Sequence, residues 1–393
     1  MAAAPQPPAS LPAILAITFL GSVSGGAFWT AIYFITAHHY RFTPSRNLAL
    51  AALMGAAYSV AALRAGSIVS AAGRLLSPRA LLAACLMVQA LAALSPILLG
   101  VEAAVWAGAV VGVVASAVVW PLVESYLAAG RHGAEMRSVI GWFNVVWTPA
   151  VALPLLTMPL LASYDIRLSL ALTAVANALA LAAVARLPLR PGRHESEAAA
   201  AHVGREYAQL LRSASWLLPL SYVLSSTISP MLPYRLAAIG VSASIGSVVA
   251  ATWMVARFVT LAVMSRAGFW HGRWGTLALG AAGLVAGLAA VLLAGSVAGL
   301  LVGLSLFGVG MGLTYYAALY YALAVGHAEV EAGGTFEGLV GVGYTIGPLL
   351  GLGGLALGGA AHQAQATVGL TWAIVALASW PALRPWAEAR RRR

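Results

Sequence analysis

The chain repeatedly runs for more than twenty residues without a charged side chain. No Asp, Glu, Lys or Arg occurs from Leu11 to Ala37, from Ala80 to Gly100 or from Trp274 to Val325. A helix needs about 20 apolar residues to cross the roughly 30 Å hydrocarbon core of a bilayer. Because 61% of all residues are hydrophobic and only 8% are charged, we predict an integral membrane protein with almost no part outside the bilayer.

Clusters of glycine, proline and charged residues divide the chain into twelve predicted membrane spans. The length of the apolar runs favours helices, because the strands of a membrane barrel would alternate over about 10 residues. The fold class is therefore an all-α polytopic membrane protein. The twelve spans are 12–37, 47–71, 80–100, 103–128, 138–163, 168–187, 213–235, 243–265, 274–296, 298–325, 333–359 and 364–384.

The longest polar stretch lies in the middle of the chain and divides the spans six and six. We predict a six-helix bundle over residues 1–187, a cytoplasmic linker over 188–212 with a surface helix at 196–211, and a second bundle with a basic tail over 213–393. The two halves match at an offset of 194 residues, at which Arg79 corresponds to Arg273 and Tyr126 to Tyr320. Such a parallel repeat is typical of secondary transporters and predicts pseudo-two-fold symmetry.

The distribution of arginine predicts the orientation of the chain. With both termini in the cytoplasm, sixteen arginines lie in cytoplasmic loops and the tail, and only four lie outside. This is the positive-inside pattern of a protein of the cell (plasma or inner) membrane. It also explains the net charge of +11 without a nucleic-acid partner. The single cysteine, Cys85, lies in an apolar run, so we predict no disulfide, metal site or cofactor.

The loop between the second and third spans carries a local motif. It reads Gly66-Ser67-Ile68-Val69-Ser70-Ala71-Ala72-Gly73-Arg74. With the twelve spans, this loop makes the chain similar to the major facilitator superfamily, whose pattern here is Gly, three residues, Asp-Arg, one residue, Gly-Arg. The glycines and the last arginine match. Ser70 stands where that family has the aspartate that helps close the cytoplasmic side, so closure here must use other residues.

Four charged residues lie inside the predicted spans, all in their cytoplasmic halves. Each costs roughly 2.5–3.5 kcal/mol at the bilayer centre, so each is a candidate functional residue. Arg257 is the deepest, roughly 13 Å from the end of its helix. One interpretation pairs them as structural salt bridges or a gate, Arg64 with Glu124 and Arg257 with Glu337. In the other, Arg257 binds an anionic group of a substrate while Glu124 or Glu337 exchanges a proton.

The resemblance implies that the first, fourth, seventh and tenth helices line a central cavity. Each carries polar or aromatic residues four positions apart, which places them on one helix face. They would offer stacking surfaces and hydroxyl groups to an organic solute; alternatively, the aromatic residues anchor the protein at the membrane interfaces. Tyr315 and Tyr321 extend the tenth-helix cluster, and Asn144 and Trp147 present a similar choice on the fifth helix. The candidate cavity residues are Trp29, Tyr33, Trp120, Glu124, Tyr222, Ser226, Arg257, Tyr316 and Tyr320.

These observations favour a secondary active transporter or facilitator of a small organic solute, which is anionic if Arg257 binds it. The transporter would act by alternating access, with a proton as a candidate coupling ion, and we expect a monomer. The alternatives are a proton-coupled exporter of amphiphilic drug-like compounds and a non-transporting membrane sensor. An enzyme is not expected, because the chain has one aspartate, Asp165, and lacks a nucleophile elbow or a paired-histidine zinc motif.

Overall fold

The computed structural model describes residues 9–131, 133–192, 205–324 and 330–391, in which every regular element is a helix. The first half of the chain contains α1 (Leu11–Gly26) continued through the π-helix η1 (Ala27–Ala31) into α2 (Ile32–His38), α3 (Pro44–Leu63) with α4 (Ala65–Ala72), α5 (Pro78–Leu99), α6 (Glu102–Ala128), α7 (Gly133–Ala150) with α8 (Leu153–Ala162), and α9 (Leu168–Val184). The second half contains α10 (Arg205–Ile228), α11 (Leu232–Ala238), α12 (Ala243–Ala250) with α13 (Thr252–Arg266), α14 (Trp274–Leu293), α15 (Val297–Ala324), α16 (Val330–Ala378) and α17 (Trp380–Arg391).

The helix count agrees with the twelve predicted spans. Among the described residues, nine helices are long and apolar enough to cross a membrane. One of them, α16, has 49 residues and serves as two spans, because its backbone leaves the helical conformation at Gly359 and His362. The shorter α9 and the more polar start of α10 explain why these two spans are not among the nine.

The predicted boundaries of the seventh and twelfth spans differ from the structure. The seventh span was expected to reach residue 235, but α10 ends at Ile228 and α11 begins at Leu232. The twelfth span was expected to reach residue 384, but α16 ends at Ala378 and a separate helix, α17, begins at Trp380. Pro381 stands in the first turn of α17, where proline favours a new helix start. The predicted surface helix, 196–211, lies mostly outside the described residues, and its last part, 205–211, forms the first turns of α10.

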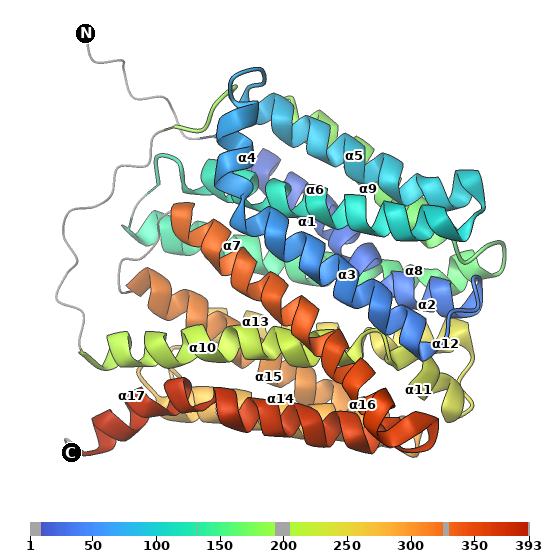
Figure 1. Cartoon of the computed structure of the whole chain (residues 1–393). Coiled ribbons are helices and arrows are strands. Elements are labelled where there is room, and N and C mark those ends of the chain that lie inside the picture. The colour runs from blue at the N-terminus through green and yellow to red at the C-terminus, as the bar shows by residue number, and fades with distance from the viewer. Residues whose placement is uncertain (1–8, 132, 193–204, 325–329, 392–393) are drawn as a thin grey trace, which may run out of the picture.

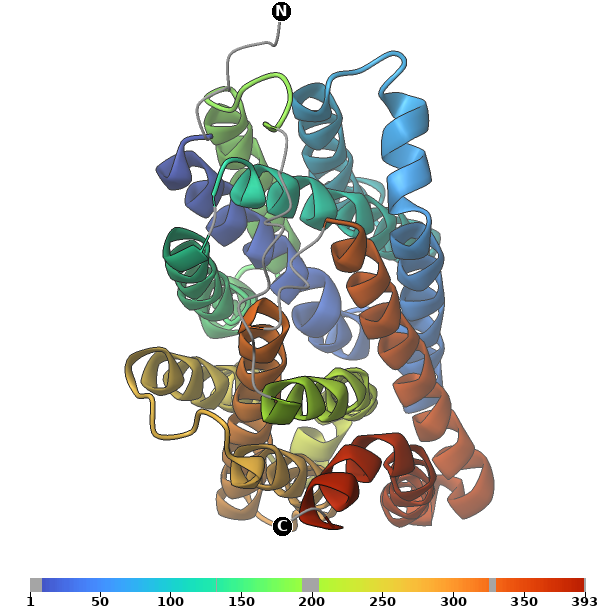
Figure 2. The ribbon, with the colours of Figure 1, turned by 90° about the vertical axis from the view of Figure 1, so that its left-hand side faces the viewer.

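The helices form two groups that lie side by side (Figure 1). The helices of the first half occupy the upper part of the view, and those of the second half the lower part, with α16 crossing in front. We call the end where α10 begins and α17 lies the linker side; Figure 2 views the molecule from that end. The other end is called the opposite side.

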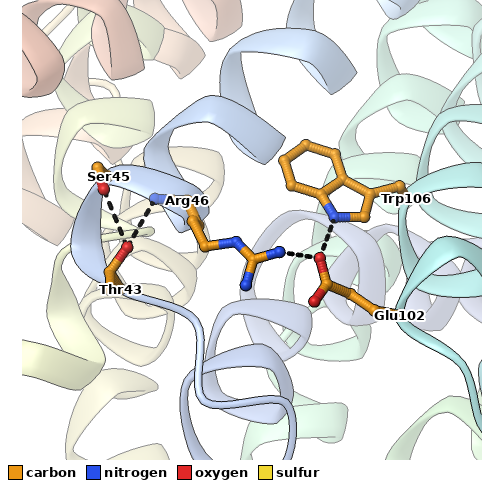
Figure 3. Close-up of polar contacts among 5 residues, drawn as sticks. All are labelled: Thr43, Ser45, Arg46, Glu102 and Trp106. Atoms are coloured by element: carbon orange, nitrogen blue, oxygen red, sulfur yellow. Dashed lines mark hydrogen bonds and ion pairs between the residues drawn. The ribbon is translucent and has the colours of Figure 1, made fainter.

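Polar contacts on the opposite side fix the starts of α3 and α6 (Figure 3). Thr43 caps α3 by accepting a hydrogen bond from the backbone N–H of Arg46 at 3.4 Å. The guanidinium of Arg46 forms an ion pair with Glu102, the first residue of α6. The indole N–H of Trp106 donates to the same carboxylate at 3.1 Å. Capping satisfies backbone groups that a helix end would otherwise leave unpaired.

The helix α16 joins the two halves through its glycines. A Cβ atom at Gly341 would lie 2.7 Å from the Cα of Ser59 on α3, and one at Gly347 would lie 2.2 Å from the carbonyl oxygen of Val223 on α10. Only glycine permits such close backbone approach, which membrane helices use because van der Waals packing drives their association. This packing brings α3 of the first half against a helix of the second.

We predict that Gly347→Ala destabilises the protein, because the new methyl group overlaps backbone atoms of α10 that cannot move alone. Overpacking of this kind costs about 1–3 kcal/mol. The matched control is Gly369→Ala on the same helix, where a Cβ meets no atom within 4 Å and alanine favours the helix. Thermal unfolding in detergent checks the pair; equal melting temperatures for the two variants would contradict the prediction.

Candidate functional site

Two adjoining cavities lie between the halves of the molecule. The first, which we call the Arg257 chamber, has a volume of about 80 Å³. The second, the Glu chamber, has a volume of about 110 Å³ and lies nearer the linker side, where Glu124 stands near the end of α6. The two chambers share Trp29, Trp147, Val151, Tyr222 and Tyr344 as lining residues. Together they form one central cavity, to which both halves contribute.

Arg257 of α13 is buried, with 4% of its surface exposed, between two aromatic rings. Its guanidinium carbon lies 4.6 Å from the ring centre of Trp147 on α7 and 4.7 Å from that of Tyr315 on α15. One Nη atom lies 3.5 Å from the hydroxyl oxygen of Tyr222, and Nε has no hydrogen-bond partner among the described residues. Cation–π contacts therefore hold the charge in place, while the guanidinium keeps unused donors for an anion.

The two acidic residues line the Glu chamber. Glu124 comes from α6 of the first half, and Glu337 from the first turns of α16 in the second. Tyr58 on α3 donates a hydrogen bond from its hydroxyl to Glu337. The chamber therefore places two carboxylates from opposite halves in one small space.

Neither predicted salt bridge forms. The ion pairs of the described residues include Arg46–Glu102, Arg131–Glu135 and Arg167–Asp165. The expected Arg64–Glu124 and Arg257–Glu337 pairs do not occur among them. Arg64 stands at the break between α3 and α4 and is exposed, because its long side chain reaches the surface. Aromatic rings surround Arg257 where a carboxylate was expected.

A layer of aromatic rings lies where the two chambers meet. Trp29 of η1 and Tyr344 of α16 are stacked, with ring centres 3.9 Å apart and planes 10° from parallel. Tyr58 forms a T-shaped contact with Trp29, with ring centres 5.5 Å apart. Tyr222 forms a similar contact with Tyr344, with ring centres 5.3 Å apart. The layer joins the halves, since Trp29 and Tyr58 belong to the first half and the other two residues to the second.

Local breaks in two helices place these rings. The first span widens into the π-helix η1 at Trp29, and π-helical turns are frequent at functional sites. The fifth span breaks between α7 and α8, and a Cβ at Gly26 would lie 2.1 Å from the carbonyl oxygen of Val151 at that break. On α7, the amide oxygen of Asn144 accepts a 2.9 Å hydrogen bond from the indole of Trp147, which orients this ring toward Arg257.

The structure brings most of the predicted cavity residues together. Ser226 lines the Arg257 chamber, although its hydroxyl is already engaged in a 2.9 Å bond to the carbonyl oxygen of Gly343. The predicted residues that line the two chambers are Trp29, Tyr33, Trp120, Glu124, Tyr222, Ser226, Arg257 and Glu337.

Two predicted residues of the tenth helix lie elsewhere. Tyr316 and Tyr320 of α15 line a separate hollow of about 340 Å³ on the linker side, between α7, α15 and the loop after α13. Tyr315, one position earlier, faces the central cavity instead. In the hollow, Tyr320 stacks on His271, with ring centres 4.3 Å apart, and burial lowers the pKa of that histidine.

The predicted loop motif does not contribute to the cavity. Gly66 and Ser70 lie on α4, and Gly73 ends that helix. Arg74 follows in the turn toward α5. Gly66, Ser70 and Arg74 are exposed on the linker side. The motif was expected in a loop, but most of it forms the helix α4, and only Gly73 and Arg74 lie in the turn that follows.

Two residues that were not predicted as cavity residues, Tyr58 and Tyr344, complete the site. Trp147, for which the sequence left the cavity position open, also lines it. Tyr344 occurs within the glycine- and proline-rich stretch of α16, where a large aromatic residue among small ones is a usable signal. Trp147 lies three positions after Asn144, which places both on one face of α7. Tyr58 has no comparable signal, because its acidic partner is 279 positions away in sequence.

Comparison with solved structures identifies the fold. The nucleoside transporter NupG superposes with a TM-score of 0.67 at 12% identity, covering 96% of this chain and 98% of that one. The human organic anion transporter MFSD10 (TETRAN) superposes with a TM-score of 0.64 at 16% identity, covering 96% of this chain and 100% of that one. A bacterial homologue of the human lysosomal transporter Spinster, inward-facing and unoccupied, gives 0.64 at 12% identity, with 96% and 97% covered.

These likenesses define a class by its fold. The chain is a multi-pass membrane protein with two six-helix bundles around a central cavity. Its architecture is the major facilitator fold, as the resemblance of the sequence implied. No sequence model of a protein family matches the chain, and no curated protein matches it in sequence.

We predict that Trp147→Leu destabilises the protein by about 2 kcal/mol or more, because it removes one of the two rings that hold the buried Arg257 charge. Trp142→Leu is the matched control, since Trp142 lies on the same helix but is 57% exposed. Thermal unfolding of both variants in detergent measures the difference. If the two substitutions lower the melting temperature equally, the ring contact contributes nothing to stability.

Proposed function

We propose that the protein is a secondary transporter or facilitator of a small organic solute with an anionic group, which binds at Arg257. The observation that carries the proposal is a buried guanidinium that faces a cavity between the halves and has no carboxylate within ion-pair distance among the described residues. An uncompensated buried charge costs several kcal/mol. A bound carboxylate or phosphate would offset that cost with paired hydrogen bonds.

The size of the cavity supports a small substrate. Pockets for drug-sized ligands measure about 300–1,000 Å³, which exceeds both chambers. An engineered apolar cavity of about 150 Å³ in another protein holds benzene, and the two chambers together exceed that volume. The solute that fits best is one ring with short substituents. The aromatic lining offers such a ring stacking surfaces.

The contacts between the halves support alternating access. On the opposite side, the hydroxyl of Tyr234, beyond α10, donates to the carbonyl oxygen of Phe42 in the first half at 2.7 Å. The linker side holds the 340 Å³ hollow between α7, α15 and the loop after α13. The opposite side holds a larger hollow of about 740 Å³ between the start of α3 and the second half, so the hollows assign no open side. We infer that the linker side faces the cytoplasm of a cell (plasma or inner) membrane, in keeping with the arginine distribution.

The structural neighbours are compatible with this proposal. MFSD10 is an organic anion transporter and NupG a nucleoside transporter, so the same fold accommodates anionic and ring-containing solutes. Transport instead of catalysis also agrees with a cavity built from both halves, because a rocking motion of the halves would expose it to either side.

We predict that organic anions stabilise the wild-type protein and that Arg257→Gln abolishes this effect. A ligand at 100 times its Kd adds about 2.7 kcal/mol to the free energy of unfolding. Thermal unfolding in detergent would be measured with carboxylates, phosphate esters, sugars, amino acids and cationic drugs. Arg64→Gln, a change at an exposed arginine, is the matched control and should respond as wild type does.

Flux into proteoliposomes then tests transport of any stabilising anion, with Arg257→Gln as the inactive reference. Stabilisation only by neutral or cationic compounds, with no response to any organic anion, would refute the anion site. That result would support the export of amphiphilic drug-like compounds instead.

A further inference from the structure

We propose that the Glu chamber is a subsite for a positively charged organic nitrogen, so that the bound solute carries an ammonium-type group as well as its anionic group. This inference rests on the proposed function, because it describes the second end of the solute placed at Arg257. The two ends would lie in adjoining chambers that differ in charge.

The first argument is the charge of the Glu chamber. Glu124 has no hydrogen-bond or ion-pair partner among the described residues, and Glu337 receives only the hydroxyl of Tyr58 there. Two carboxylates lining one small cavity repel each other. Arg257, the nearest deep cation of the adjoining chamber, is held by rings and does not pair with either. The chamber therefore favours a cation from outside the chain.

The second argument is the chemistry of the walls. Trp29, Trp120 and Phe143 line the Glu chamber together with the carboxylates, and ring faces attract organic cations. A metal ion fits less well, since no group of three or more His, Cys, Asp or Glu side chains gathers anywhere in the described part of the chain. An organic ammonium uses both the rings and the acids. The competing occupant is a proton.

The third argument is the position of the unpartnered arginine. Arg257 is nine-tenths buried or more, its Nε has no partner in the described ranges, and it faces the Arg257 chamber. Because Trp29, Tyr222 and Tyr344 line both chambers, a ligand that fills both passes these rings, and their surfaces favour a planar body. The solute thus has a ring or other planar unit, with an anion at one end and a cationic nitrogen at the other.

Three matched probes separate the two charges. They are 4-(aminomethyl)benzoate, which carries both, 4-methylbenzoate, which carries only the anion, and 4-methylbenzylamine, which carries only the cation. Binding to the full-length protein in detergent is measured by thermal unfolding and by calorimetric titration. We expect the doubly charged probe to bind at least tenfold more tightly than either of the others. A hydrogen bond between charged groups contributes about this much to affinity.

Substitutions assign the effect to the chamber. We expect Glu124→Gln and Glu337→Gln each to weaken 4-(aminomethyl)benzoate at least tenfold while leaving 4-methylbenzoate unchanged or tighter. Glu102→Gln is the control and should leave the binding of all three probes unchanged. Glu102 lies on the same helix as Glu124 but at its opposite end, where its carboxylate pairs with Arg46.

The outcomes distinguish a failure of the ammonium subsite from a failure of the proposed anion site. If the doubly charged probe binds no more tightly than 4-methylbenzoate, including no binding of either, the ammonium subsite is refuted. It is also refuted if the glutamine variants change the binding of 4-(aminomethyl)benzoate and 4-methylbenzoate equally, as expected of a site that holds only a proton, because glutamine resembles a protonated glutamate. If Arg257→Gln leaves anion binding intact while the glutamates still select the amine, the subsite stands and the anion site fails.

Discussion

The close approach of α16 to α3 and α10 determines where the rest of the site lies. Gly341 and Gly347 allow backbone contact on two sides of one helix, and Glu337 and Tyr344 lie on the same stretch of that helix. Once the glycines fix α16, the carboxylate and the ring can only face the space between the halves. The same stretch of α16 therefore both packs the helix against its neighbours and places Glu337 and Tyr344 in the cavity.

The spans were predictable from sequence, whereas the rotation of each helix was not. Charge-free runs indicate how much chain crosses the bilayer, and depth from the helix end singled out Arg257. In α15, apolar residues occur on all faces, so no polar stripe marks the side that faces the cavity. The prediction therefore favoured Tyr316 and Tyr320 and named Tyr315 only as an extension of their cluster. The structure places Tyr315 in the cavity and the other two in a separate hollow.

The side chains that contact the buried charges could not be predicted from the sequence either, for a different reason. Opposite charges in neighbouring spans invite pairing, because an isolated charge in hydrocarbon is costly. The rings of Trp147 and Tyr315 offset that cost for Arg257. The hydroxyl of Tyr58 offsets it for Glu337 by a hydrogen bond. Such aromatic residues are so common in membrane helices that their identity alone does not distinguish a charge partner from an interfacial anchor.

The charge balance of the cavity constrains how such a transporter would be driven. A solute with one anionic and one cationic end carries no net charge, so its passage alone moves none across the membrane. The membrane potential, which acts only on net charge, would then leave its distribution unchanged. Accumulation of this solute would need a coupled ion or an exchanged solute, and a proton and the ammonium group would compete for the carboxylates of Glu124 and Glu337. Such competition is compatible with exchange of the solute against a proton as well as with equilibration of the solute down its own gradient.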